Sequence, residues 1–209
     1  MVRGLNKKEK SQVTRIAKNA VKKTSDPKHF RIVQSSRLDV DSTLTNSNTT
    51  IYLNNIPQGV QNNQRIGSRV YLDKLYLSGN VLIGKTASGL ARESILRMIL
   101  VRTNEPKADW DQDRPAFYGT YSDAWLPFIE KVYFDKTIYL NPGGQNVAGY
   151  ARPIDFEVNL NGALCEFPGD GTSSAARGAL VLCVISNITG PAGEFPSIQY
   201  DTKLVFRDP

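Results

Sequence analysis

Three groups of residues have types and spacings that could support chemistry. Residues 79–86 read Gly-Asn-Val-Leu-Ile-Gly-Lys-Thr and match the phosphate-binding pattern G-x-x-x-x-G-K-[ST]. Asp109, Asp111 and Asp113 place carboxylates at alternate positions, as in the first half of a calcium-binding loop. His29 is the single histidine, so histidine triads and twin-histidine metal sites are excluded by counting.

The phosphate-binding spacing lies in a stretch that favours a strand. A P-loop wraps successive backbone N–H groups around phosphate in a flexible, glycine-rich turn. Val81, Leu82 and Ile83 fill the middle of the match, and bulky apolar residues favour an extended backbone instead. We therefore expect a strand that ends in a Gly-Lys-Thr turn. A nucleotide hydrolase that uses residues 79–86 is the lesser alternative.

The acidic stretch follows a calcium loop only over its first half. Arg114 stands where an EF-hand needs glycine, and Thr120 stands where it needs a bidentate glutamate. We expect a solvated acidic loop. Structural calcium held by Asp109, Asp111 and Asp113 between subunits is the alternative, and we expect no other cofactor.

The two cysteines lie in apolar stretches. Cys165 is preceded by Ala-Leu, and Cys183 lies between Val-Leu and Val-Ile. Free buried thiols are the expected state of such residues, rather than a disulfide or a nucleophile. The sequence therefore predicts no catalytic residue and no enzyme activity.

The elements that carry these groups are short strands. From His29 onward, apolar and aromatic runs alternate with clusters of Gly, Pro, Asn, Asp and Ser, which is typical of an antiparallel sandwich or barrel. The predicted strands are residues 30–38, 50–54, 69–83, 95–103, 131–134, 137–140, 154–165, 179–186 and 198–206.

Three of these strands carry further information. The apolar phase of strand 69–83 switches near Asp73 and Lys74, which predicts a β-bulge. Strand 154–165 alternates apolar and polar residues, so one of its faces should meet water. Residues 95–101 and 179–185 are apolar on both faces, which predicts central or covered strands.

The N-terminal segment differs from the rest of the chain in charge. Residues 1–31 hold ten bases and two acids, a net charge of 10 − 2 = +8, whereas the whole chain carries 26 − 20 = +6. The remainder is therefore −2, and such an asymmetry predicts a polyanionic partner. The bases that we expect to bind nucleic acid are Arg3, Lys7, Lys8, Lys10, Arg15, Lys18, Lys22, Lys23, Lys28 and Arg31.

Apolar residues recur along this arm with the spacing of one helical stripe. They are Val13, Ile16, Ala17, Ala20 and Val21. The spacing predicts a helix over about residues 7–23 that is marginal alone and orders against another arm or against nucleic acid. We therefore divide the chain into a basic arm, residues 1–31, and an all-β domain, residues 32–209. No apolar run is long enough for a membrane span or a secretory signal.

Several stretches resemble known coat proteins. Residues 58–79, 97–106, 132–140 and 203–209 resemble strands in the coat proteins of small circular single-stranded DNA viruses. The arm and its junction, residues 15–18 and 28–33, resemble satellite necrosis virus coat proteins. The resemblance implies an eight-stranded antiparallel jelly-roll sandwich, one per subunit, in a T=1 icosahedral shell of sixty subunits with inward basic arms.

The resemblance also implies a function. We expect a viral capsid protein that binds copies of itself, packages a single-stranded DNA or RNA genome and resides in the virion. Synthesis is expected in the host cytoplasm, with localisation in the host nucleus if the genome is DNA, and no membrane partner is expected. A non-viral, lectin-like jelly-roll binding protein with a basic localisation tail is the alternative.

Overall fold

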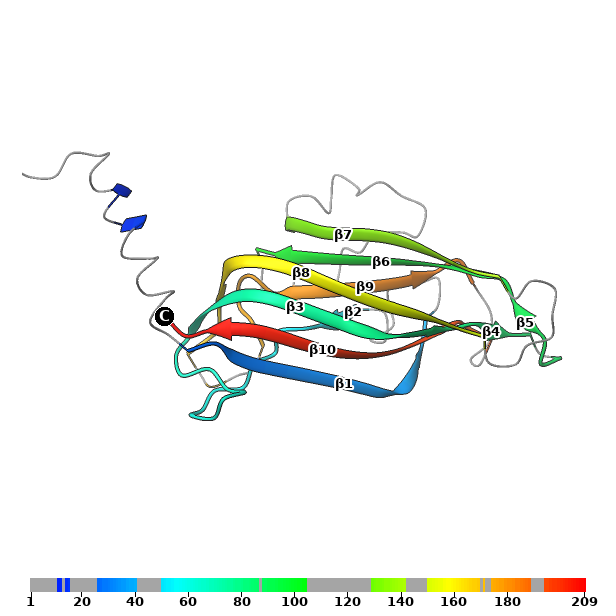
Figure 1. The fold of residues 1–209 in the computed structure, drawn as a ribbon, viewed down its shortest axis with the longest axis horizontal. Helices are drawn as coiled ribbons and strands as arrows, with labels where there is room; N and C mark the ends of the chain where they lie inside the picture. The colour runs from blue at the N-terminus through cyan, green and yellow to red at the C-terminus, as the bar shows by residue number, and fades with distance from the viewer. Residues whose placement is uncertain are drawn as a thin grey trace, which may run out of the picture.

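The computed structural model is a sandwich of two four-stranded sheets (Figure 1). It describes residues 11–12, 14–15, 26–40, 50–86, 88–104, 129–141, 150–169, 171, 174–188 and 194–209. In the part of the chain so described, no helix is long and apolar enough to cross a membrane. Ser11, Gln12, Thr14 and Arg15, within the predicted arm helix, are helical and exposed.

The first sheet has the strand order β1-β10-β3-β8. Its strands are β1 (Lys28–Asp39), β10 (Ser197–Arg207), β3 (Arg69–Leu82) and β8 (Ala151–Glu166). Alternation along β8 leaves Asp155, Glu157 and Asn159 exposed and the residues that alternate with them buried or half-buried, so the predicted wet face is confirmed.

The second sheet has the strand order β2-β9-β6-β7. Its strands are β2 (Thr50–Tyr52), β9 (Leu180–Ser186), β6 (Ser94–Thr103) and β7 (Ile129–Leu140). Every residue of β9 is buried, and β9 and β6 are the two inner strands. The central position predicted for the two doubly apolar runs is confirmed.

The pairing of strands is nested along the chain. Antiparallel pairs join β1 to β10, β2 to β9, β3 to β8 and β6 to β7. The first long strand thus pairs with the last, and each pair encloses the next, as when one long antiparallel ribbon rolls over itself. This is the topology of the predicted eight-stranded jelly roll.

The predicted bulge is confirmed in β3. Its register to β10 shifts because Leu72 and Lys74 face the consecutive residues Phe206 and Val205, which leaves Asp73 as the extra residue. Leu72 before the bulge and Leu75 after it are both fully buried, although they are three residues apart. The extra residue lets one long strand keep its apolar side chains in the core across the change of phase.

Two details differ from the strands predicted from sequence. Residues 131–134 and 137–140 belong to one strand, β7, because Asp135 and Lys136 continue the ladder opposite Ile99 and Met98. A short hairpin, β4 (Gly84–Lys85) with β5 (Ala91–Arg92), was not expected. Two-residue strands are too short to show periodicity.

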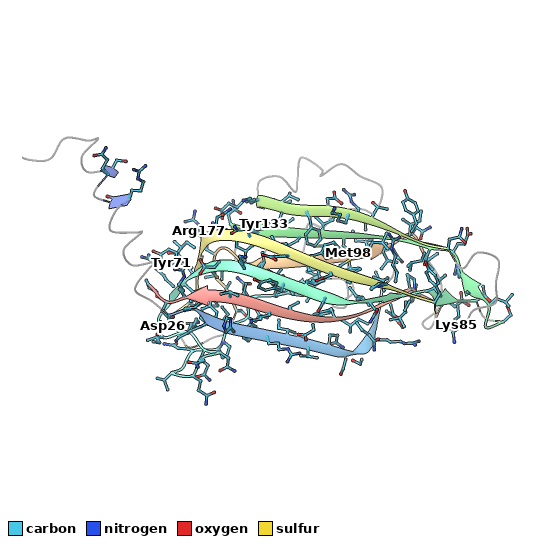
Figure 2. The ribbon with its side chains drawn as sticks, viewed as in Figure 1. Asp26, Tyr71, Lys85, Met98, Tyr133 and Arg177 are labelled. Atoms are coloured by element: carbon cyan, nitrogen blue, oxygen red, sulfur yellow. The ribbon has the colours of Figure 1, made fainter. Side chains whose placement is uncertain are left out.

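The two ends of the sandwich are distinct. At one end β1 begins at Lys28 opposite Phe206 of β10, so the N-terminal arm and the C-terminus leave together. We call this the arm end, and Asp26 lies there, whereas Lys85 of the β4–β5 hairpin lies at the opposite end (Figure 2). The arm is therefore attached to one pole of an elongated body (Figure 1).

Candidate functional site

The last bases of the predicted arm belong to the first sheet. Lys28 and Arg31 both lie in β1. The Lys28 ammonium is 2.7 Å from a carboxylate oxygen of Asp208 and donates to the carbonyl oxygen of Gln64 at 3.0 Å. Because only 15% of its side chain is exposed, Lys28 acts here as a structural cation.

Arg31 is paired across the ladder. Its Nε donates to Asp201 Oδ1 at 2.9 Å, and its Nη2 also contacts that carboxylate. The pKa of the Asp201 carboxyl is lowered, chiefly by the hydrogen bond from Arg31. The charges of Lys28 and Arg31 are therefore balanced within the body before any nucleic acid arrives.

The remaining predicted nucleic-acid contacts precede β1. Arg15 is exposed and helical. Seven further bases, Arg3, Lys7, Lys8, Lys10, Lys18, Lys22 and Lys23, lie outside the described residues. The predicted arm–arm residues Val13, Ile16, Ala17, Ala20 and Val21 also lie outside them, so their packing stays a prediction.

When the boundary between arm and body is placed at Lys28, where β1 begins, the two parts differ in charge in a simpler way. Residues 1–27 hold eight bases and two acids, a net charge of 8 − 2 = +6. The chain carries 26 − 20 = +6, so residues 28–209 hold 18 bases and 18 acids and are neutral. The whole excess of positive charge therefore precedes the sandwich.

The solvent face of the first sheet is balanced by ion pairs. Lys74 Nζ lies 2.7 Å from Glu157 Oε1, and Arg207 Nε lies 2.5 Å from Asp73 Oδ2. With the pair of Arg31 and Asp201, each base of these pairs meets a carboxylate on a neighbouring strand or at the bulge. A phosphate chain gains little on such a face, because each contact would have to break an existing pair.

The segment with phosphate-binding spacing is extended. Gly79 pairs with Tyr200 on one side and Ile154 on the other, within the ladders of β3. A side chain on Gly79 would collide with the Gln199 carbonyl oxygen, so this glycine serves close strand packing. The segment ends in a turn in which Gly89 N–H donates to the Thr86 carbonyl oxygen at 2.8 Å. Backbone N–H groups committed to ladders cannot wrap a phosphate.

The other candidate chemical groups are the two cysteines and the three aspartates of the acidic stretch. Cys165 and Cys183 are free and buried, as expected. Desolvation raises the pKa of the Cys165 thiol to about 12, which keeps it protonated and unreactive at neutral pH. Asp109, Asp111 and Asp113 lie outside the described residues, so the calcium site stays a prediction. Elsewhere in the described chain, no three His, Cys, Asp or Glu side chains gather as a metal site.

The sequence reasoning missed a buried arginine. Arg65, between β2 and β3, is fully buried, and its guanidinium carbon lies 4.2 Å from the centre of the Phe167 ring. The available signal is that Arg65 is the single charged residue between Leu53 and Ser68. This signal does not by itself indicate burial, because arginine is mostly exposed in folded proteins.

Comparisons with known proteins found a sequence family and similar solved structures. The sequence profile of the geminivirus coat protein/nuclear export factor BR1 family matches residues 2–125. A solved structure from Desmodium yellow mottle tymovirus aligns with 88% of this chain and 89% of its own chain, at a TM-score of 0.41 and 10% sequence identity. No curated protein matches in sequence.

The family match spans the basic arm, β1 and β3 of the first sheet, β2 and β6 of the second sheet, and the β4–β5 hairpin. It covers more than half of the chain and agrees with the coat-protein resemblance of the strand stretches. The chain therefore belongs to the geminivirus coat protein/nuclear export factor BR1 family.

Proposed function

We propose that this coat protein assembles into a T=1 icosahedral shell of sixty subunits and packages a single-stranded genome, DNA or RNA, through its N-terminal arm. The observation that carries the proposal is the division of charge. Residues 1–27 carry +6, and the body that follows is neutral. The positive charge thus sits on a segment attached to one pole of a wedge-like sandwich that can tile a shell.

The charge of sixty arms is large enough to hold a genome. Counting the +6 of residues 1–27 gives 60 × 6, or about +360 per shell, which releases counterions from several hundred phosphates. The count to Arg31 would give 60 × 8, or about +480, but Lys28 and Arg31 are engaged by Asp208 and Asp201. The smaller figure is the one that we expect to govern packaging.

A single-stranded cargo suits a shell of this size. Duplex DNA has a persistence length of about 50 nm, so bending it inside a sixty-subunit shell costs free energy that a flexible strand avoids. Lysine and arginine contact phosphate without reading bases, so binding should tolerate any sequence. The protein resides in the virion. It is synthesised in the host cytoplasm and passes through the nucleus if the genome is DNA.

Deletion of residues 1–23 tests the role of the arm. The truncated chain should keep the fold of the sandwich, because the first strand starts at Lys28, and should lose most of its encapsidated nucleic acid. The measurement is the ratio of absorbance at 260 and 280 nm of purified particles, with circular dichroism as the check on fold. Equal packaging by the truncated chain would contradict the proposal.

A second variant separates charge from helix packing. Ile16→Ser combined with Val21→Ser keeps every base and removes two residues of the apolar stripe. If arms pack on one another, this variant should bind nucleic acid as dispersed subunits yet assemble less completely. Unchanged assembly would leave the arm as a simple polycation.

A further inference from the structure

The connection between β2 and β3 is a long loop with a fixed shape. We call residues 57–66 the anchored loop. Arg65 holds it from inside: Nε donates to the Ile56 carbonyl oxygen at 3.2 Å, and Nη1 donates to that of Gly67. The guanidinium also stacks on Phe167, which follows β8. A loop of this length without strands or helices is usually functional, and this one is tied to the core.

The backbone of the anchored loop closes on itself. The Arg65 N–H donates to the Pro57 carbonyl oxygen, and the Gly59 N–H donates to the Arg65 carbonyl oxygen, both at 2.9 Å. At the tip, the Gln64 N–H donates to the Gln61 carbonyl oxygen at 3.0 Å. The tip is therefore ordered before any partner binds, which lowers the entropy cost of an association.

The anchored loop also touches the root of the arm. The His29 N–H donates to the Asn62 carbonyl oxygen at 3.2 Å, and Lys28 Nζ donates to that of Gln64. The Ile66 N–H donates to Asp208 Oδ1 at 3.0 Å. Loop, first strand and C-terminus thus form one unit at the arm end, where the loop projects beside β1 (Figure 1).

The exposed surface of the anchored loop is uncharged and combines two apolar side chains with several amides. Val60 at its tip is 91% exposed, and Ile66 is 60% exposed. Charged residues make up 22% of the chain, yet the single one between Leu53 and Ser68 is the buried Arg65. Among the large apolar side chains of the described residues, that of Val60 is the most exposed, and it lies on a loop whose shape is fixed by internal hydrogen bonds.

We propose that the anchored loop is a subunit contact, with Val60 inserted against a second copy of this chain. The inference rests on the proposed function, because it uses the inward direction of the arm. A loop at the arm end lies toward the interior or a subunit boundary, away from anything outside the shell. It presents no cation to phosphate, so another uncharged protein surface is the occupant that fits.

Thiol labelling of a Val60→Cys variant tests the contact directly. Both native cysteines are buried, so wild-type particles give a low background. The rate of reaction with a maleimide is measured in assembled particles and in the same subunits after dispersal. We expect labelling to be at least about tenfold slower in particles, since a contact core excludes reagent and water.

The labelling outcomes are distinct. Equal rates in particles and dispersed subunits would overturn the contact while leaving the shell intact. Protection of dispersed subunits by a single-stranded oligonucleotide would assign the loop to the genome and also overturn it. Failure of the wild-type chain to form any particle would instead overturn the proposed function, and the contact with it.

Assembly of two Val60 variants gives a second readout. Val60→Asp should raise the subunit concentration needed for assembly by at least about tenfold, because a desolvated charge opposes association. Val60→Thr keeps the shape of valine and should change the subunit concentration needed for assembly far less. The urea midpoints of both dispersed variants should match wild type, because Val60 is exposed. Assembly of Val60→Asp at the wild-type concentration would reject the contact.

Discussion

At the scale of single residues, the environment decides what a side chain can do. Lys28 and Arg31 have the same charge as the bases that precede them, but their place in β1 gives them carboxylate partners. Cys165 is a thiol 0% exposed, and Asn54 Nδ2 donates to its sulfur at 3.2 Å. Burial therefore fixes its protonation state.

The raised pKa of Cys165 predicts a loss of stability at high pH. The folded state keeps the proton up to about pH 12, whereas the unfolded thiol loses it near 9.0. The folded state therefore binds more protons between these values, and the free energy of unfolding falls as pH rises. Between pH 8 and pH 10 this thiol should lower it by about 1.4 kcal/mol.

Urea unfolding of dispersed Cys165→Ala subunits, under reducing conditions, isolates this effect. The variant keeps the other titrating groups, and Asn54 Nδ2 still donates to the Gly178 carbonyl oxygen at 3.1 Å. Its free energy of unfolding should fall less than that of wild type between pH 8 and pH 10. An equal fall in both proteins would show that the thiol does not titrate as its burial implies.

The sequence predicts the environment of Cys165 but not that of Arg65. The buried state of Cys165 follows from its apolar neighbours, because burial of a small apolar side chain is the common outcome. Arg65 could not be placed by the same rule, because arginine is rarely buried and its partners are backbone carbonyls and Phe167. Those partners come from segments about ten and one hundred residues apart, which no local pattern reports.

At the scale of elements, both edges of the first sheet carry features that oppose pairing with other strands. The β1 edge has a bulge between Gln34 and Leu38, and its His29 N–H is taken by the Asn62 carbonyl oxygen. The β8 edge contains Pro153, which has no N–H to donate. Copies of this chain should therefore not associate by extending the first sheet.

The close approach of β10 to β3 predicts a severe effect at Gly79. An alanine Cβ there would lie against the Gln199 carbonyl oxygen and 2.9 Å from Tyr200 Cα, both backbone atoms that cannot rotate away. Gly79→Ala should lower the free energy of unfolding by about 1–3 kcal/mol. Gly169→Ala is the matched control, because a Cβ there meets nothing within 4 Å. Chemical denaturation of both dispersed variants is the measurement, and equal midpoints would contradict the packing argument.

Predictions of elements succeeded where the pattern of apolar residues extends over a long run. The phase switch in β3 gave the bulge at Asp73, and the doubly apolar runs gave the inner strands β6 and β9. The predicted break within β7 was wrong because Asp135 and Lys136 resemble a turn in composition. They lie on an edge strand, where both positions meet water, so charge there does not end the ladder.

At the scale of the whole molecule, the nested pairing brings the first and last strands of the chain side by side. β1 pairs with β10, about 170 residues away, so the arm and the C-terminus must leave from one pole. Composition and periodicity indicate a sandwich, but they do not say which strands pair. The resemblance to coat proteins implied a jelly roll, and the structure confirms that fold. The neutral body then follows from placing Lys28 and Arg31 in the first sheet.

The division between a charged arm and a neutral body predicts which bases set the salt dependence of genome binding. For single strands, the slope of log K against log salt is about −0.7 per phosphate neutralised. Lys22→Gln with Lys23→Gln should make this slope shallower by about 1.4. Arg31→Gln with Lys74→Gln removes the same charge from the first sheet and should leave the slope unchanged, because Asp201 and Glu157 engage these two bases. Fluorescence anisotropy of a labelled single-stranded oligonucleotide with dispersed subunits measures both slopes. A loss of slope in the sheet variant as large as in the arm variant would place the genome on the body of the sandwich rather than on the arm.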